Sequence, residues 1–301
     1  DAAQPLCEDV FETIRRLKGD EDPRTLTAMD NLAGLYRKQD RLQDAEPLYM
    51  KALDTRRRVL GPEHPETLRS MTNLALLYDQ QGRHGKAELL LKETLKTLCR
   101  VGEENPETLR TMNNLAAIYD RQGRYKLAEP LHAKTLEIQL RMFDEDHPHV
   151  LISRNSLAQL YTVQGRHGEA EPLLVKILES QRRLLGAEHP KTLTAMENLV
   201  ECLAAQDRLD EAEPMLRETL ALCEKAMPDD WRRFQTMSLL GATLMAQARV
   251  LRATNAARAE EQFVEAEPLL VSGYEGMKQR EAQIPAPVKA VWAWGHRGLG
   301  M

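Results

Sequence analysis

The sequence predicts an all-α protein in which antiparallel helix pairs stack into a solenoid. A set of short motifs recurs with a period of about 42 residues, which is typical of a repeat architecture. Within each copy the apolar residues follow the spacing of one face of a helix. Only 5% of the residues are aromatic, while Ala, Leu, Glu and Arg are abundant, and this composition favours helices over strands.

The first motif, Pro-x-Thr-Leu, opens each repeat. It begins at Pro23, Pro65, Pro106 and Pro190, with a diverged copy at Pro148, so successive prolines lie 42, 41, 42 and 42 residues apart. Each copy continues with a sequence such as Asn-Leu-Ala-x-Leu-Tyr. After a turn comes the second motif, Ala-Glu-Pro-Leu or a close variant, at Ala45, Ala87, Ala128, Ala170 and Ala212. This order predicts two helices in every repeat.

Local chemistry predicts where these helices begin and end. Proline suits the first position of a helix, so the residue before each proline is the expected N-cap, namely Asp22, His64, Asn105, His147 and His189. The first helix should end at a left-handed residue, which is Gly82, Gly123, Gly165, or Asp in the outer copies at Asp40 and Asp207. The second helix is longer, and its proline is expected in the first turn or at a kink.

These features resemble the tetratricopeptide repeat. Its large, small, aromatic, turn-glycine and alanine positions are matched here by Leu74, Ala75, Tyr78, Gly82 and Ala87. The resemblance covers roughly residues 3 to 280 and implies a right-handed superhelix whose first helices line a concave surface. The period exceeds the usual length of about 34 residues. The Asn-Leu-Ala-x-Leu-Tyr core and the Leu-Gly-x-x-His-Pro loop are similar to the repeats of kinesin light chains and their bacterial relatives.

The sixth copy has its own resemblance, carried by Trp231 to Phe234 and Gly273 to Arg280. It is similar to the terminal repeat of arrays attached to bacterial serine/threonine protein kinases of planctomycetes. The sequence contains no Gly-rich phosphate loop, His-Arg-Asp or Asp-Phe-Gly motif. We therefore expect no enzyme in this chain, and any kinase activity would lie outside it.

The repeat register divides the chain into four expected segments. They are an orphan second helix of a truncated repeat in residues 1–20, five tandem repeats in 21–228, a sixth repeat in 229–283 with an insertion near 249–262, and a non-repeat tail in 284–301. The orphan helix should expose Val10, Ile14 and Leu17, which predicts self-association or missing upstream sequence. Trp292 and Trp294 in the tail either are loosely ordered or dock over the groove.

Composition disfavours several classes of function. A net charge of −5 argues against a bulk polyanion binder, and no stretch of 18 apolar residues or signal sequence points to a membrane. The four cysteines lack metal or redox spacing, so we expect small buried thiols and a cytoplasmic protein. The histidines recur at a cap position without a third ligand, so neither a metal nor a cofactor is expected. Arg56 to Arg58 are expected on a solvated convex face.

Candidate ligand contacts lie on the first helices. In tetratricopeptide geometry the inward positions are the residue before the conserved Leu and those at −5, −2, +2, +5 and +6 from it. Asn recurs at one of these positions, and an amide, which both donates and accepts, suits an extended peptide backbone. The alternative is that the Asn side chains serve a neighbouring helix. The candidate peptide-binding residues are Asn31, Arg37, Arg69, Asn73, Asp79, Arg110, Asn113, Asn114, Arg121 and Asn198.

The sequence therefore predicts a scaffold that binds an extended segment of a partner protein in a concave groove. Five cations against three carboxylates in the first three copies favour an acidic ligand seated toward the N-terminal half, whereas Glu197 and Glu201 make the later copies acidic. The alternative is a structural or regulatory repeat region of a larger bacterial kinase. An RNA-binding repeat would need a basic groove, which the mixed charge disfavours. No nucleic-acid or membrane partner is expected.

Overall fold

The computed structural model describes residues 3–285 and 288. This part of the chain forms thirteen α-helices and one short 3-10 helix, Glu281–Gln283, and it contains no strand. The all-α prediction is confirmed. The helices are α1 (Ala3–Lys18), α2 (Pro23–Lys38), α3 (Leu42–Val59), α4 (Pro65–Gln80), α5 (His84–Val101), α6 (Pro106–Arg121), α7 (Tyr125–Met142), α8 (Pro148–Val163), α9 (His167–Leu185), α10 (Pro190–Ala205), α11 (Leu209–Ala226), α12 (Trp231–Leu251) and α13 (Ala256–Gln279).

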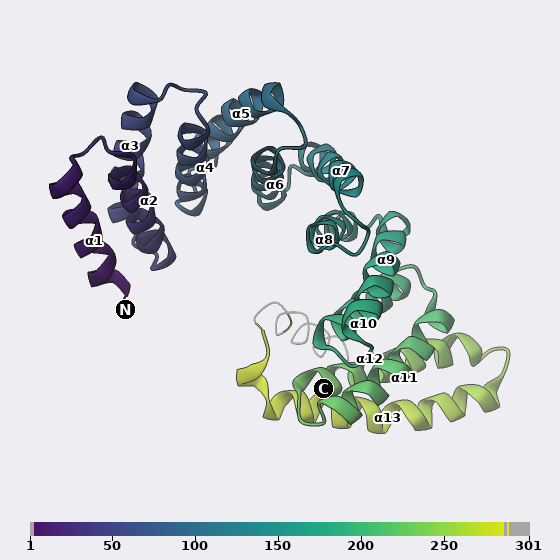
Figure 1. Cartoon of the computed structure of the whole chain (residues 1–301). Helices are drawn as coiled ribbons and strands as arrows, with labels where there is room; N and C mark the ends of the chain where they lie inside the picture. The colour runs from purple at the N-terminus through teal and green to yellow at the C-terminus, as the bar shows by residue number, and fades with distance from the viewer. Residues whose placement is uncertain (1–2, 286–287, 289–301) are drawn as a thin grey trace. The chain divides into compact units, whose positions relative to one another are not determined.

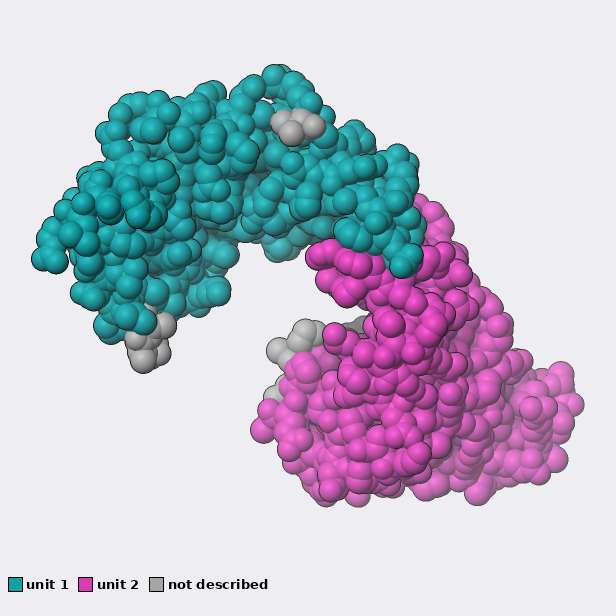
Figure 2. All heavy atoms as spheres, in the orientation of Figure 1, with its two compact units in different colours: residues 1–144 teal, residues 145–301 magenta. Residues whose placement is uncertain are grey.

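The chain divides into two compact units, residues 1–144 and 145–301 (Figure 2). The first unit contains α1 to α7 and the second contains α8 to α13. Within each unit every helix packs against the next one in the chain (Figure 1). In the first unit the helices α2, α4 and α6 also contact one another in order, so the first helices of successive repeats lie side by side.

The apolar stripe of each helix forms a continuous core between neighbours. In α4 the side chains of Leu68, Met71, Leu74, Ala75 and Tyr78 are buried, as the helical spacing predicts. The same methionine position is almost fully buried in three other first helices. Each helix pair therefore depends on its neighbours to remove its apolar face from water, and the packing energy is spread along the array.

The predicted helix starts are all present. In α2, α4, α6, α8 and α10 the residue before the proline has extended backbone, and its side chain accepts a hydrogen bond from the N–H two residues later. His64 does this through Nδ1, which accepts from the N–H of Glu66 at 3.2 Å. A histidine can therefore take the place that Asp22 and Asn105 fill with an oxygen.

The threonine of Pro-x-Thr-Leu has a structural role that the motif alone did not indicate. The Thr67 hydroxyl donates to the carbonyl of Gly61, six residues earlier, at 2.8 Å. Equivalent bonds of 2.7 to 2.9 Å join Thr25 to Gly19, Thr108 to Gly102 and Thr192 to Gly186. In the diverged copy Val150 replaces the threonine and Asp144 replaces the glycine six residues before it. The bond thus ties the end of one repeat to the first turn of the next.

The turn inside each pair also follows the prediction. Gly82, Gly123 and Gly165 have φ values of 74°, 68° and 70°, in the left-handed region where glycine is favoured. Asp40 and Asp207 occupy the equivalent positions with φ values of 61° and 60°. The N–H after each such residue bonds back to a carbonyl five residues earlier, as Arg83 does with Tyr78 at 2.7 Å.

The glutamate of the second motif joins adjacent repeats. Glu88 on α5 accepts from the Tyr119 hydroxyl at 3.0 Å and from Arg124 at 2.6 Å. Arg124 also lies over the Tyr119 ring, 4.7 Å from its centroid. Burial raises the pKa of Glu88, but bonds from Arg124, Lys92 and Tyr119 outweigh it and lower the value to about 2. Elsewhere Arg83 bonds Glu46 at 2.6 Å and Arg208 bonds Glu171 at 2.5 Å.

The predicted insertion of the sixth copy lengthens its two helices. α12 has 21 residues and α13 has 24, and only residues 252–255 connect them. The two helices approach closely where α13 carries glycine. A side chain at Gly276 would overlap the ring of Phe234, with its Cβ only 1.9 Å from Cδ1. The expected tail from residue 289 on, with Trp292 and Trp294, lies outside the described residues.

Some burial predictions are wrong. Arg56 was expected on a solvated face, yet it is 1% exposed because it lies on the inward stripe of α3 beside Tyr49 and Leu53. Cys202 and Cys223 are buried as expected, but Cys99 is exposed. On α1, Val10 and Leu17 are exposed as predicted, whereas Ile14 is half-buried against the core.

The prolines of the second helices do not take the first of the two predicted places, the first turn of the helix. α3 begins at Leu42, five residues before Pro47, so this proline lies beyond the first turn. Pro130, Pro172, Pro214 and Pro268 likewise lie inside α7, α9, α11 and α13.

Candidate functional site

The candidate contact residues lie on the first helices of both units. In the first unit they belong to α2, α4 and α6, and in the second unit Asn198 lies on α10. Asn31 is exposed, and Asn73, Asn113, Asn114 and Asn198 are half-buried. The repeat register therefore places each of them at the surface of its own unit and leaves no Asn of this group in the core.

The asparagine side chains have no partner among the described residues. The amides of Asn31, Asn73, Asn114 and Asn198 make no hydrogen bond there, and the Nδ2 of Asn114 is buried without an acceptor. The alternative, that these amides serve a neighbouring helix, is therefore not supported. An unpaired amide beside a helix surface can both donate to and accept from an incoming peptide group.

The two arginines proposed to attract an acidic ligand are already paired within their own helices. Arg69 bonds Glu66 at 2.5 Å on α4, and Arg110 bonds Glu107 at 2.5 Å on α6. Both guanidiniums remain partly exposed, at 38% and 39% of the side chain. The charge count that favoured an acidic ligand had left out these glutamates, so the net positive charge of this surface is smaller than the groove residues alone indicate.

Asp79 connects neighbouring repeats. Its carboxylate accepts from Arg121 on α6, and its other oxygen lies 2.8 Å from Nδ1 of His84 at the start of α5. Asp120, at the equivalent position of the next repeat, lies 2.8 Å from Nε2 of His132. The contacts of Asp79 join α4 to α5 and α6, and that of Asp120 joins α6 to α7. Arg37, the remaining candidate, is half-buried, and its Nε makes no hydrogen bond among the described residues.

The position two residues before the conserved leucine was predicted to face the groove, but it is buried in some repeats. Asp30 is 7% exposed, and Nη1 of the buried Arg56 donates to it at 2.5 Å. The same arginine donates to the hydroxyl of Ser70 at 2.5 Å, which makes a closed contact between α2, α3 and α4. Burial raises the pKa of Asp30, and Arg56 opposes that effect. Asp30 is therefore a packing residue, although the sequence predicts it to be one of the three carboxylates of the groove in the first three copies.

Glu197 lies at the position equivalent to Asp30, two residues before the conserved leucine, and is also buried. Among the described residues it forms no hydrogen bond like the one between Asp30 and Arg56. Its side chain is 7% exposed, and Oε1 makes no hydrogen bond among the described residues. Burial raises its pKa to about 7; Arg232 lowers it, while Glu201 and Asp230 raise it further. Desolvation also raises the pKa of Glu201, one turn later, although part of that side chain is exposed.

Neither a metal centre nor a membrane-spanning helix is found in the part of the chain that the structure describes. No three His, Cys, Asp or Glu side chains there come together in a way that would hold an ion. None of the described helices combines the length and apolarity needed to cross a bilayer.

Comparison with known proteins gives one family and several similar structures. The tetratricopeptide repeat model matches residues 1–56, 28–100, 97–141, 107–180 and 149–225. No curated protein sequence matches the chain. The nearly identical TPR-like repeats of a candidate kinesin light chain of Podosopora anserina are 28% identical, with a TM-score of 0.62 over 67% of this chain and 96% of that one.

Two more distant structures share the fold. BtubC (BKLC) of P. vanneervenii is 22% identical, with a TM-score of 0.59 over 82% of this chain and 94% of that one. The C-terminal part of a TPR repeat-containing protein of Cytophaga hutchinsonii is 13% identical, with a TM-score of 0.61 over 89% and 92%. The expected likeness to kinesin light chain-type repeats is thus confirmed.

Proposed function

The chain belongs to the tetratricopeptide repeat family, and on that premise we propose that it is a non-catalytic interaction module whose first helices bind an extended peptide segment of a partner protein. The observation that carries the proposal is the recurring asparagine. Four such amides follow one register position, and none is hydrogen-bonded within the described residues. A peptide backbone presents N–H and C=O groups whatever its side chains, so it is the ligand that repeated amides suit best.

Charge contributes to selectivity in this proposal more than to affinity. A ligand carboxylate near Arg69 or Arg110 would compete with Glu66 or Glu107, which already occupy part of each guanidinium. Arg has five N–H donors, so it can hold two carboxylates at once. We expect an acidic residue in the ligand to be preferred at low salt, with the preference decreasing as salt screens these exposed groups.

The test uses a phage-displayed library of random 12-residue peptides selected on the full chain. Selected peptides should bind the Asn73→Ala/Asn114→Ala variant about tenfold or more weakly, because each lost hydrogen bond costs about 1 kcal/mol. Lys96→Ala/Glu137→Ala is the matched control, since these exposed residues lie on α5 and α7 of the same two helix pairs. Failure to select any peptide, or equal loss in both variants, would contradict the proposal.

Three finer points remain proposals. A kinase-associated role rests on the sequence of the sixth copy alone. Self-association through α1 is supported by the exposure of Leu6, Val10 and Leu17. A reducing, cytoplasmic setting is consistent with all four cysteines being free.

A further inference from the structure

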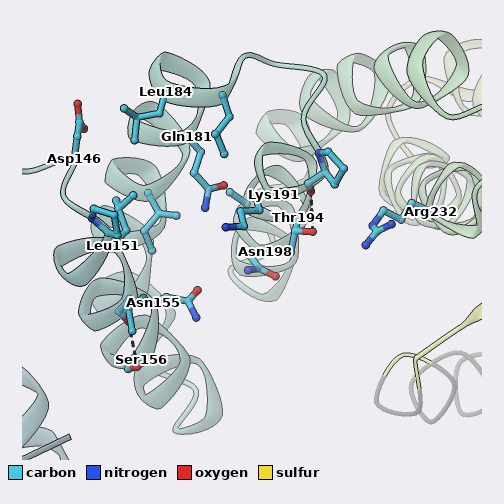
Figure 3. Close-up of a pocket in the computed structure, with 16 residues that line it drawn as sticks. Asp146, Leu151, Asn155, Ser156, Gln181, Leu184, Lys191, Thr194, Asn198 and Arg232 are labelled. Atoms are coloured by element: carbon cyan, nitrogen blue, oxygen red, sulfur yellow. Dashed lines mark hydrogen bonds between the residues drawn. The ribbon is translucent and has the colours of Figure 1, made fainter. Parts of the chain in front are cut away.

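A cavity of about 550 Å³ opens in the second unit between α8, α9 and α10, with Arg232 of α12 at one side (Figure 3). Asn155 of α8 and Gln181 of α9 point into the space between α8 and α10. Its remaining wall includes Asn198, the member of the asparagine series that lies in this unit. The cavity therefore shares Asn198 with the surface that the proposed function uses.

The sequence explains why the space is open here. At the equivalent junction of the first unit, the long side chain of Arg56 is buried and bonds both Asp30 and Ser70. In the repeat register Gln181, Asn155 and Ala195 take these three positions. Gln181 is shorter than arginine, and Ala195 offers no hydroxyl for it to bond. The contact that Arg56 makes with Asp30 and Ser70 in the first unit therefore cannot form around Gln181, and the space beside Gln181 stays unfilled.

The wall of the cavity is apolar at one position where the other complete repeats are polar. Ile152 lies five residues before the conserved leucine, a position that holds Thr or Arg in every other complete repeat, and it is 60% exposed. Leu184 and Leu185, at the end of α9, are 53% and 43% exposed and line the same cavity. Three large aliphatic side chains facing one open space are unusual on a water-exposed surface and indicate a place for an apolar group.

The side-chain amides that line the cavity are neutral and unpaired among the described residues, whereas the hydroxyls of Ser156 and Thr194 donate to carbonyls of their own helices. Oε1 of Gln181 is buried without a donor, and the amides of Asn155 and Asn198 make no hydrogen bond within the described residues. The charged groups are at the edge and mostly neutralised. Asp146 is bonded by Arg183, which lowers the pKa of that carboxyl to about 2, and Arg232 pairs with Asp230 at 3.3 Å. Lys191 is a further cation of the lining.

We propose that this cavity is a subsite for one large apolar side chain of the bound peptide, with Gln181, Asn155 and Asn198 pairing with the peptide backbone on either side of it. The inference rests on the proposed function and adds where the ligand is anchored and by which chemistry. Unpaired amides suit a backbone, and the uncharged interior suits Leu, Met or an aromatic residue and disfavours a buried charge. The ligand thus needs an apolar anchor in the second unit, which is independent of any acidic residue opposite Arg69 and Arg110.

The experiment compares two substitutions on one helix. Ile152 and Val163 both lie on α8 and are 60% and 59% exposed, but only Ile152 lines the cavity. Peptides selected from the random 12-residue library on the full chain are measured against Ile152→Asp and Val163→Asp by fluorescence polarisation. Circular dichroism checks that both variants keep the helical content of the unchanged chain. We expect a shared large apolar residue in the peptides and at least a tenfold loss with Ile152→Asp, against less than twofold with Val163→Asp.

A second variant tests the backbone contacts. Gln181→Leu removes the amide and keeps the size of the side chain, so the peptides should bind several-fold more weakly while still requiring their apolar residue. Peptides that need Asn73 and Asn114 but tolerate Ile152→Asp would overturn the subsite and leave the proposed function standing. A library that yields no binding peptide would overturn both. Equal loss with the two aspartate variants would show a general charge effect, and it would also contradict the subsite.

Discussion

Arg56 and Asp30 form an ion pair between α3 and α2, with Nη1 donating to Oδ2 at 2.5 Å and both side chains almost completely buried. Ser70 of α4 completes the contact by accepting from the same guanidinium. Three helices therefore meet at one buried polar cluster. Burial of two charges is costly, and the hydrogen bond between the partners offsets part of that cost.

Removal of one partner should be strongly destabilising. Arg56→Ala leaves the Asp30 carboxyl buried without its cation, and the expected loss is about 3–5 kcal/mol. Arg58→Ala, on the exposed side of the same helix, should cost far less, because solvent screens its pair with Glu21. Denaturant unfolding followed by circular dichroism measures both. Equal effects of the two substitutions would show that the buried pair has no special role.

The next repeat indicates how the charge pair can be replaced. At the positions of Asp30 and Arg56 it carries Thr72 and Leu98, both buried. The double variant Asp30→Thr/Arg56→Leu should therefore recover most of the stability that Arg56→Ala loses, since an apolar replacement of a buried pair is often neutral. A double variant as unstable as Arg56→Ala would show that the cluster cannot be exchanged between repeats.

Replacement of an aspartate at the turn should be stabilising. Asp207 has φ = 60°, a conformation that costs a non-glycine residue about 1 kcal/mol, so Asp207→Gly should raise stability by up to that amount. Asp40→Gly should gain less, because its side chain accepts from Gln80 at 3.2 Å and that bond is lost. The converse substitution Gly165→Asp should lower the thermal midpoint. A destabilising Asp207→Gly would mean that the larger freedom of glycine in the unfolded chain outweighs the relief of strain.

Features set by neighbouring residues could be predicted from the sequence. Proline at the first helical position and glycine after the last one act within a single turn, so the caps at Asp22 and His64 and the turn at Gly82 follow from local chemistry. The period then places every helix pair. The bond from Thr67 to Gly61 could also have been found, because the two residues change together in the diverged copy.

Features that depend on several helices could not be predicted in the same way. The burial of Arg56 requires Asp30 and Ser70 from two other helices, and nothing local to the arginine run indicates them. The cavity beside Gln181 arises from a difference between two junctions, which becomes visible only when the residues that fill one of them are known. The pairing of Arg69 with Glu66 was overlooked because the groove positions had been counted without their helical neighbours.

Loss of the Glu88 contact should make the first unit less stable, and the effect should vanish in acid. The folded pKa of about 2 lies below the ordinary value of 4.5, so the stabilisation is complete above pH 4.5 and is lost as the pH falls toward 2. Glu88→Gln should therefore destabilise the chain at pH 7 and have little effect near pH 2. Glu93→Gln on the same helix, whose side chain is mostly exposed, is the control. A difference that stays constant over this range would show that the charge of Glu88 is not what joins the repeats.

Glu197 should give the opposite pH dependence in the second unit. Its pKa of about 7 exceeds the ordinary 4.5, so the folded chain holds the proton more tightly than the unfolded chain does. Stability is then highest below pH 4.5 and falls as the pH rises to about 7, by about 1.4 kcal/mol for each unit of difference. Glu197→Gln keeps a neutral side chain at every pH, so it should become more stable than the unchanged protein between pH 5 and 8.

The control is Glu260→Gln, on the exposed side of α13, which should leave the pH dependence of stability unchanged. The measurement is the unfolding midpoint of the three proteins at pH 5 and pH 8. If the stability of Glu197→Gln changes with pH as that of the unchanged chain does, the titrating group is not Glu197.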